Sequence, residues 1–191
     1  GFLRAFKLGR GIVGSRFLYE PMPRATVRLF MTNNFNTYIE SPAVDYLREL
    51  CLREGELRQY DRGDAFFSAG TVARYLGYIK SGTLKYVAYS DDGTEHVLGL
   101  EFSGEFVTDF PFSLRGQKAR TSVIAETPCE IYCVSTATLG ERLKSDSEFR
   151  EIVMMGTEAV FATVYDRYMD LHCKTAQQRY NDLISKHPDL F

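Results

Sequence analysis

Residues 74–101 read RYLGYIKSGTLKYVAYSDDGTEHVLGLE and contain three short runs in which apolar and polar residues alternate. Alternation with a period of two predicts strands with one buried face. Ser81-Gly82 separates the first run from the second, and Asp91-Asp92-Gly93 separates the second from the third. In the latter turn, glycine supplies the positive φ that a tight hairpin needs, and aspartate tolerates it. We therefore expect an antiparallel hairpin over residues 83–101.

The same pattern continues on both sides, from Leu57 to Val134. Four more short runs lie at 57–60, 65–68, 120–125 and 129–134, and turn residues such as those at 61–64 and Thr127-Pro128 separate them. Strands that recur roughly every 8–12 residues with turn signals between them are typical of a β-sandwich or barrel. The fold class is therefore mostly β with α.

Helical patterns flank this region. Ser41-Pro42 is an N-cap serine followed by a first-turn proline, and a helix is expected from there to Gly55. After Val134 a short helix, capped by Ser135 or Thr136, is expected to run to about Lys144.

A longer helix is predicted over residues 147–173, with Ser145-Asp146 as its cap. At 1.5 Å per residue it is about 39 Å long, which exceeds the width of a small barrel. An apolar stripe with helical spacing runs along it, formed by Ile152, Val153, Gly156, Val160, Val164, Tyr168 and Leu171. Such a stripe indicates a homodimer through a second copy of the same helix. The alternative is a helix that packs only on its own barrel.

The last predicted helix follows Lys174. Thr175 and Gln178 have the spacing of a capping box, in which each side chain caps the other's backbone N–H. The helix is expected to end at His187-Pro188.

Composition excludes several classes of function. The chain has 191 residues, a net charge of −2 and no tryptophan among its 14% aromatic residues. A basic surface of the kind that binds nucleic acid is therefore not expected over the chain as a whole. No apolar run approaches the roughly 18 residues of a membrane span, so no membrane partner is expected. The cysteines are scattered, which favours buried free thiols in a reducing cytoplasm; they are Cys51, Cys129, Cys133 and Cys173.

Residues 1–30 differ from the rest because they hold six basic residues and one acidic residue. Three interpretations stand: a targeting peptide, an extension upstream of a natural start at Met31, or a basic arm that touches a partner. We favour a dispensable extension, since chain termini tolerate such additions.

The sequence argues against an enzyme. His96, His172 and His187 lack the clustering with a carboxylate that a cupin metal site needs, and no metal site is expected. The chain also has no GxSxG, Walker or HExxH motif. A haem sensor would need an axial ligand to the iron, and His96 and Cys51 are the candidates. A single histidine in a strand is, however, typically a half-exposed surface residue.

The order of these motifs resembles the Crp/Fnr family of bacterial transcription regulators over residues 35–191. The segment YIKSGTLK at 78–85 is similar to that family's aromatic-x-x-x-Gly-x-x-Lys hairpin, and FSGEF at 102–106 is similar to its Gly-Asp-Phe turn. KTAQQRY at 174–180 and HPDLF at 187–191 resemble the hinge and first helix of its DNA-binding half, in the style of Bacteroidetes members.

This resemblance implies a double-stranded β-helix jelly roll, similar to cyclic-nucleotide-binding domains, followed by a long dimerisation helix. It divides the chain into a basic extension of unclear role at 1–30, a sensor roll at 35–146 and a dimerisation helix at 147–173. Residues 174–191 would be the hinge and first helix of a DNA-binding domain. The helix-turn-helix that reads the major groove would be missing from this chain.

The resemblance also marks ligand-binding positions. Cyclic-nucleotide members carry Gly-Glu-Leu at a short phosphate-binding helix and Arg-Ser/Thr-Ala on the next strand. The corresponding residues here are Thr108, Asp109, Phe110, Arg120, Thr121 and Ser122. Arg120 suits a phosphate. Thr108 in place of glycine hinders the approach of backbone N–H groups, and Pro111 removes one donor.

Cyclic AMP or GMP is therefore allowed by the resemblance and disfavoured by the residues, and no other cofactor is expected. The alternative is an orphan pocket in which Arg120 pairs with Asp109 or lies in solvent. The function expected is the sensor and dimerisation part of a Crp/Fnr-type regulator that responds to a small effector and reaches DNA only through a further domain. The alternative is a stand-alone interaction module that does not bind DNA.

Overall fold

The computed structural model describes residues 35–188, so the extension predicted over 1–30 and the start at Met31 lie outside the described residues. The helices are η2 (Thr37–Glu40), α2 (Pro42–Glu54), η3 (Ser113–Arg115), α3 (Thr136–Ser145), α4 (Ser147–Cys173) and α5 (Ala176–Lys186). The strands are β1 (Glu56–Tyr60), β2 (Ala65–Phe67), β3 (Tyr75–Ser81), β4 (Leu84–Tyr89), β5 (Glu95–Glu101), β6 (Phe106–Val107), β7 (Ser122–Ala125) and β8 (Cys129–Ser135).

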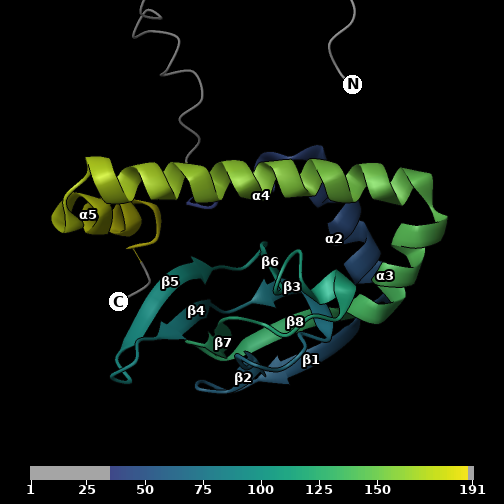
Figure 1. Cartoon of the computed structure of the whole chain (residues 1–191), viewed down its shortest axis with the longest axis horizontal. Helices are drawn as coiled ribbons and strands as arrows, with labels where there is room; N and C mark the ends of the chain where they lie inside the picture. The colour runs from purple at the N-terminus through teal and green to yellow at the C-terminus, as the bar shows by residue number, and fades with distance from the viewer. Residues whose placement is uncertain (1–34, 189–191) are drawn as a thin grey trace, which may run out of the picture. The chain divides into compact units, whose positions relative to one another are not determined.

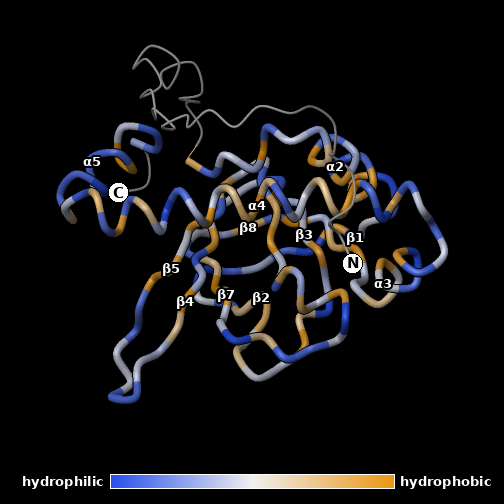
Figure 2. The backbone as a smooth tube through the Cα atoms, turned by 45° about the horizontal axis from the view of Figure 1, so that its top comes forward, coloured by the Kyte–Doolittle hydropathy of each residue, from blue (hydrophilic) through white to orange (hydrophobic). Residues whose placement is uncertain are grey.

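The strands form two four-stranded sheets, in the orders β1-β8-β3-β6 and β2-β7-β4-β5. Every pairing between these strands is antiparallel. The predicted mostly-β roll followed by a long helix is therefore confirmed (Figure 1). The β4–β5 hairpin is also confirmed, with Gly93 at a φ of +83° in its turn. Its hydrophilic tip extends from the rest of the roll in Figure 2.

The segment at 78–85 does not form the expected hairpin. β3 pairs with β8 and β6, whereas β4 pairs with β5 and β7, so the chain crosses from one sheet to the other at Gly82. Gly82 has a φ of +98°, and a Cβ there would lie 2.5 Å from the Pro128 carbonyl oxygen. Each strand pairs with a segment far along the chain because that arrangement lets the two sheets bury their inner faces against each other.

Two apolar clusters stabilise the fold. The first fills the roll between the sheets and includes Phe67, Ile79, Leu84, Val123 and Ile131. The second lies outside the roll, where the helices cover β3 and β8, and includes Leu50, Leu76, Val134, Leu139 and Phe149.

The cysteines are all free thiols. Cys51, Cys129 and Cys133 are buried as expected, but Cys173 is exposed. The expectation was wrong for Cys173, which lies exposed at the last position of α4.

The helix ends follow the predicted caps. Ser41 Oγ accepts a hydrogen bond from the Ala43 backbone at the start of α2, and Asp146 does the same for Phe149 at the start of α4. At α5 both hydrogen bonds of the Thr175–Gln178 capping box are present. These bonds join residues two or three apart, so local sequence suffices to predict them.

Helix α4 is buried to different extents along the predicted stripe. Val153, Gly156 and Val160 are half-buried where α4 packs against η2 and α2. Tyr168 and Leu171 are exposed instead. Five of the exposed apolar residues of α4 form what we call the α4 seam, which consists of Met154, Phe161, Val164, Tyr168 and Leu171.

Candidate functional site

A cavity of about 300 Å³ lies between the β-roll and α4. On the roll side its walls come from β3, β4, β5, β6 and the region around η3, and on the helix side from η2, α2, α3 and α4. In Figure 1, α4 passes over the strands, and residues of α4 and of the strands line the cavity.

Most of the cavity wall is hydrocarbon. The apolar residues that line it include Val44, Leu76, Phe106, Leu139, Phe149 and Val160. They overlap with the second apolar cluster, so the cavity is a gap in the layer that attaches the helices to the roll.

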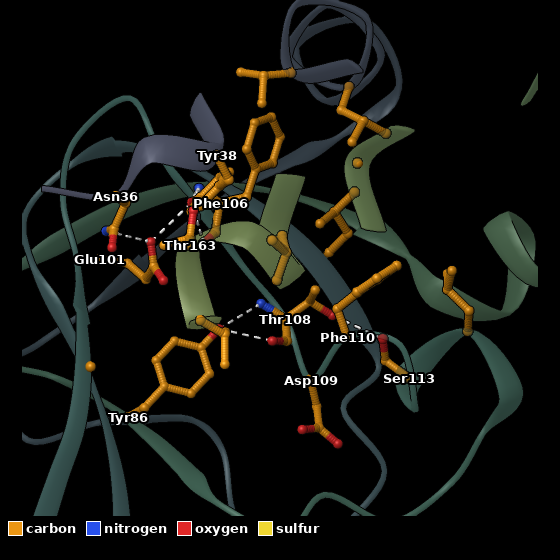
Figure 3. Close-up of a pocket in the computed structure, with 18 of the residues that line it drawn as sticks. Asn36, Tyr38, Tyr86, Glu101, Phe106, Thr108, Asp109, Phe110, Ser113 and Thr163 are labelled. Atoms are coloured by element: carbon orange, nitrogen blue, oxygen red, sulfur yellow. Dashed lines mark hydrogen bonds between the residues drawn. The ribbon is translucent and has the colours of Figure 1, made fainter. Parts of the chain in front are cut away.

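The polar groups on the roll side of the cavity bond to one another. The Tyr86 hydroxyl donates to the Thr108 carbonyl at 2.8 Å and accepts from the Thr108 N–H at 3.2 Å. The Thr108 and Ser113 hydroxyls are 3.0 Å apart (Figure 3). Burial raises the pKa of the Tyr86 hydroxyl, which therefore stays protonated and keeps its donor role.

A buried pair of carboxyl groups lies at one end of the cavity. The Asn36 side-chain amide donates to Glu105 at 2.6 Å and to Glu101 at 3.0 Å. The Tyr38 hydroxyl also donates to Glu101, at 2.9 Å, and it accepts from the Phe106 N–H at 2.9 Å. Figure 3 shows Asn36, Tyr38 and Glu101 grouped beside Thr163.

Burial raises the pKa of Glu101 well above its ordinary value of 4.5, and the nearby charge of Glu105 raises that pKa further. Burial also raises the pKa of Glu105, against the opposing effect of a hydrogen bond from the Phe102 N–H. Two carboxylates this close in a buried site resist ionising together, so the pair retains a proton more readily than exposed glutamates do.

Arg167 connects α4 to this pair. Its guanidinium donates to the Asn36 side-chain oxygen and lies 4.6 Å from the centre of the Phe35 ring. Its Nε is buried and has no hydrogen-bond partner among the described residues. The position of α4 over the roll is thus tied to η2 and to the end of β5.

The end of α5 contacts the same region. The His187 ring stacks on Phe102 with ring centroids 3.6 Å apart, next to Glu101 in sequence. Lys174 forms ion pairs with Asp170 of α4 at 2.9 Å and with Asp182 of α5 at 2.8 Å. These contacts hold the hinge between the two helices.

The structure distributes the six predicted ligand residues unequally. Those that line the cavity are Thr108, Asp109, Phe110 and Thr121. Arg120 lies outside the lining; it is exposed, 5.1 Å from the centre of the Phe112 ring, and makes no ion pair with Asp109 in the described part of the chain. Ser122 accepts a hydrogen bond from the Ala69 N–H at 2.9 Å and serves the fold.

Asp109 is buried, and its Oδ2 has no hydrogen-bond partner within residues 35–188. Burial raises the pKa of its carboxyl, and the Arg120 charge partly offsets that rise. In Figure 3 the Asp109 carboxyl group points away from Tyr38 and Phe106.

The short helix expected to begin at Thr108 begins later and is only one turn long, over Ser113–Arg115. Its nearby N–H groups already have acceptors. Ser113 donates to the Asp109 carbonyl, and both Arg115 and Gln117 donate to the Phe112 carbonyl. No cradle of free backbone donors for an anion exists among these groups.

Sequence reasoning missed the group formed by Asn36, Tyr38, Glu101, Glu105 and Arg167. One weak signal was available, since Glu105 lies between two phenylalanines at 102 and 106. Asn36 and Arg167 are 131 positions apart, and nothing in their local sequence links them.

Residues 35–188 contain no group of three or more side chains that could hold a metal ion. No helix in the same range is long and apolar enough to cross a membrane.

Comparison with known proteins agrees with this architecture. Residues 57–146 match the family model of the cyclic nucleotide-binding domain. The CRP-like protein Clp of Xanthomonas campestris and that of Xanthomonas oryzae are each 31% identical over 87 residues, covering 46% of this chain and 38% of the relative. The chain thus spans well under half the length of the curated relatives it matches.

Solved structures of Clp, of FixK2 and of a cyclic nucleotide-binding domain are similar to this chain. Clp of Xanthomonas campestris, described as a c-di-GMP responsive global regulator, has a TM-score of 0.53 and 25% identity, covering 66% of this chain and 60% of Clp. FixK2 of Bradyrhizobium japonicum has a TM-score of 0.57 and 17% identity, covering 65% and 61%. A cyclic nucleotide-binding domain of Methylobacillus flagellatus has a TM-score of 0.56 and 17% identity, covering 69% and 73%. The last two likenesses establish the fold.

Proposed function

We propose that residues 35–188 are the effector-sensing and dimerising part of a transcription regulator similar to Crp/Fnr proteins. The observation that carries this proposal is the double role of α4. Val153, Gly156 and Val160 line the cavity, and the neighbouring α4 seam is exposed, with Val164 belonging to both. An effector in the cavity would press directly on the helix that holds the dimer.

The seam has the spacing of a two-stranded coiled coil. Met154, Phe161 and Tyr168 are seven residues apart, and Val164 and Leu171 follow the last two by three. This is the a/d repeat that packs one helix against a copy of itself. Phe161 is 69% exposed and Leu171 is 61% exposed, so the face has ample apolar area to bury in a homodimer.

The proposal extends to DNA through α5. We assign this capped helix to the start of a DNA-binding half, in which a helix-turn-helix would follow. The Lys174 ion pairs and the His187 stack on Phe102 would then transmit a shift of α4 to that half. Groove-reading residues belong to the part of such a regulator beyond α5.

Sedimentation equilibrium of the chain and its variants tests the dimer. The parent chain should sediment as a dimer at micromolar concentration. The double variant Phe161→Glu, Tyr168→Glu should be a monomer, because two unpaired charges per helix would be buried in the seam. The matched control is Ala162→Glu, which places the same charge on an exposed position beside the seam and should leave the dimer intact. A monomeric parent would contradict the proposal.

The regulatory role has its own test. The reading frame beyond Phe191 should encode further helices with a helix-turn-helix, and the longer protein should bind DNA from its own promoter region in a fluorescence anisotropy titration. A stop codon directly after Phe191 would favour a stand-alone interaction module.

A further inference from the structure

We propose that the cavity binds a compact, uncharged, hydrocarbon-rich molecule of about two rings, and not a cyclic nucleotide. This inference specifies the ligand of the proposed sensor and rests on that role. It follows from the surface of the cavity, the placement of charges around it and its volume.

Most of the polar groups on the surface already bond within the protein, and the buried atoms without a partner among the described residues are Asp109 Oδ2 and Arg167 Nε. The Tyr86 hydroxyl bonds to the Thr108 backbone, and the Thr108 and Ser113 hydroxyls bond to each other. Thr163 likewise bonds to Thr37 at 2.9 Å and donates to the Ala159 carbonyl at 3.1 Å. A polyhydroxylated ligand would have to break these bonds, whereas an apolar ligand leaves them in place.

The charges around the cavity are wrong for an anion. Arg120, the expected phosphate contact, is exposed outside the lining. Arg167 is the cation among the lining residues, but Asn36 and Phe35 hold its guanidinium beside the Glu101–Glu105 pair.

The acids strengthen this conclusion. Glu101 and Asp109 both line the cavity, so a phosphate would lose its hydration beside two acids, with Arg167 as the one cation among the lining residues. The N–H groups of Ser113, Arg115, Gly116 and Gln117 around η3 also have acceptors within the protein.

The volume indicates the size of the ligand that fits between the walls. An apolar cavity of ~150 Å³ accepts benzene and stays dry without it. A cavity of about 300 Å³ is therefore suited to a molecule of about two fused rings or an equivalent branched hydrocarbon. Such a molecule would contact Val153, Gly156 and Val160 on α4, which is the contact that the sensor role requires.

Isothermal titration calorimetry of the intact chain tests the ligand class. The probes are 2-naphthol, its anionic counterpart 2-naphthoate, cyclic AMP, cyclic GMP and c-di-GMP. Naphthol should bind measurably, naphthoate roughly ten-fold or more weaker because its charge must be desolvated, and the three nucleotides should give no heat of binding.

Two variants locate the binding. Gly156→Leu adds a side chain to the cavity wall on α4, and its Cβ would lie 3.8 Å from Ala43 Cβ, an ordinary contact distance. It should weaken naphthol binding by about ten-fold or more. The matched control Ala162→Leu adds the same side chain to the exposed face of α4 and should leave naphthol binding unchanged. If circular dichroism shows that Gly156→Leu loses helix, Val160→Phe on the same wall replaces it.

Three outcomes would overturn the inference: no naphthol binding, naphthoate binding as tight as naphthol, or a nucleotide that displaces naphthol. Each leaves the dimer of the proposed function standing, because the seam variants test that separately. A monomeric parent that still binds naphthol would overturn the sensor role and keep the cavity assignment.

Discussion

The interior of the roll and the layer between the roll and α4 are both built largely from apolar residues and are packed differently. Between the sheets, Ile79, Leu84 and Ile131 have no exposed surface. Under α4, Leu76, Phe106 and Val160 surround a cavity of about 300 Å³. Well-filled cores stabilise a fold, whereas pockets that bind ligands keep unfilled space. The comparison therefore separates residues that hold the protein together from residues free to bind an effector.

The largest expected difference comes from truncating one side chain in each region. Ile131→Ala should lower the free energy of unfolding by about 2–5 kcal/mol, because it leaves a void in a close-packed interior. Val160→Ala should cost about 1 kcal/mol or less, since Val160 already borders a void and loses fewer contacts. Chemical denaturation of both variants measures the two values.

Equal losses in the two variants would contradict the distinction. The layer under α4 would then be as tightly packed in solution as the roll interior.

Two glycines give the next largest contrast. In the roll, a Cβ at Gly77 would lie 2.6 Å from Ile131 and 2.8 Å from Val107, so Gly77→Ala should cost about 1–3 kcal/mol by overpacking. On α4, a Cβ at Gly156 meets nothing closer than 3.8 Å. Gly156→Ala should therefore stabilise the protein by about 0.5–1 kcal/mol, because alanine favours helix. Thermal unfolding of the two variants should shift in opposite directions, and shifts of the same sign would be evidence against the difference in packing.

The smallest effect concerns pH, and it belongs to the cavity layer. The pKa values of Glu101 and Glu105 are raised in the folded state, mainly by burial, so the folded chain holds protons that the unfolded chain releases. Their contribution to stability is therefore fully present below the ordinary pKa of 4.5 and is lost as pH rises through the raised values. The groups that face the pair are Asn36, Tyr38, Tyr86 and Arg167.

Denaturation between about pH 5 and about pH 8 should show this loss of stability with rising pH. Glu101→Gln should flatten the profile, because the amide carries no proton to lose and still accepts from Tyr38. The control Glu158→Gln changes an exposed glutamate on α4 and should keep the parental slope. A parental slope in Glu101→Gln would exclude the pair as its origin.

Local signals predicted several elements well. The hairpin of β4 and β5 followed from Asp91-Asp92-Gly93, and α4 and α5 begin at the caps that Asp146 and Thr175 provide. These features depend on bonds within one turn of the chain, so the neighbouring residues contain the required information.

The pairing of strands and the buried side of each helix could not be predicted from local signals. Ile79 lies opposite Ile131 on β8, and many segments of similar composition compete for such a partner. The sequence predicts a hairpin at Gly82, whereas the chain crosses between the two sheets there. A glycine turn is compatible with both arrangements. The strand β6 has two residues and no period to detect.

The sequence by itself determined the mostly-β roll, the helix ends and the presence of a long apolar helix, because alternation, caps and turns act over a few residues. Only the tertiary structure decided which face of α4 covers the cavity, that Arg120 lies outside it, and that Glu101 and Glu105 share a buried site with Arg167. Those outcomes depend on which distant segments pack against each other and bury apolar surface. The identity of a single apolar or charged residue does not specify which segment will pack against it.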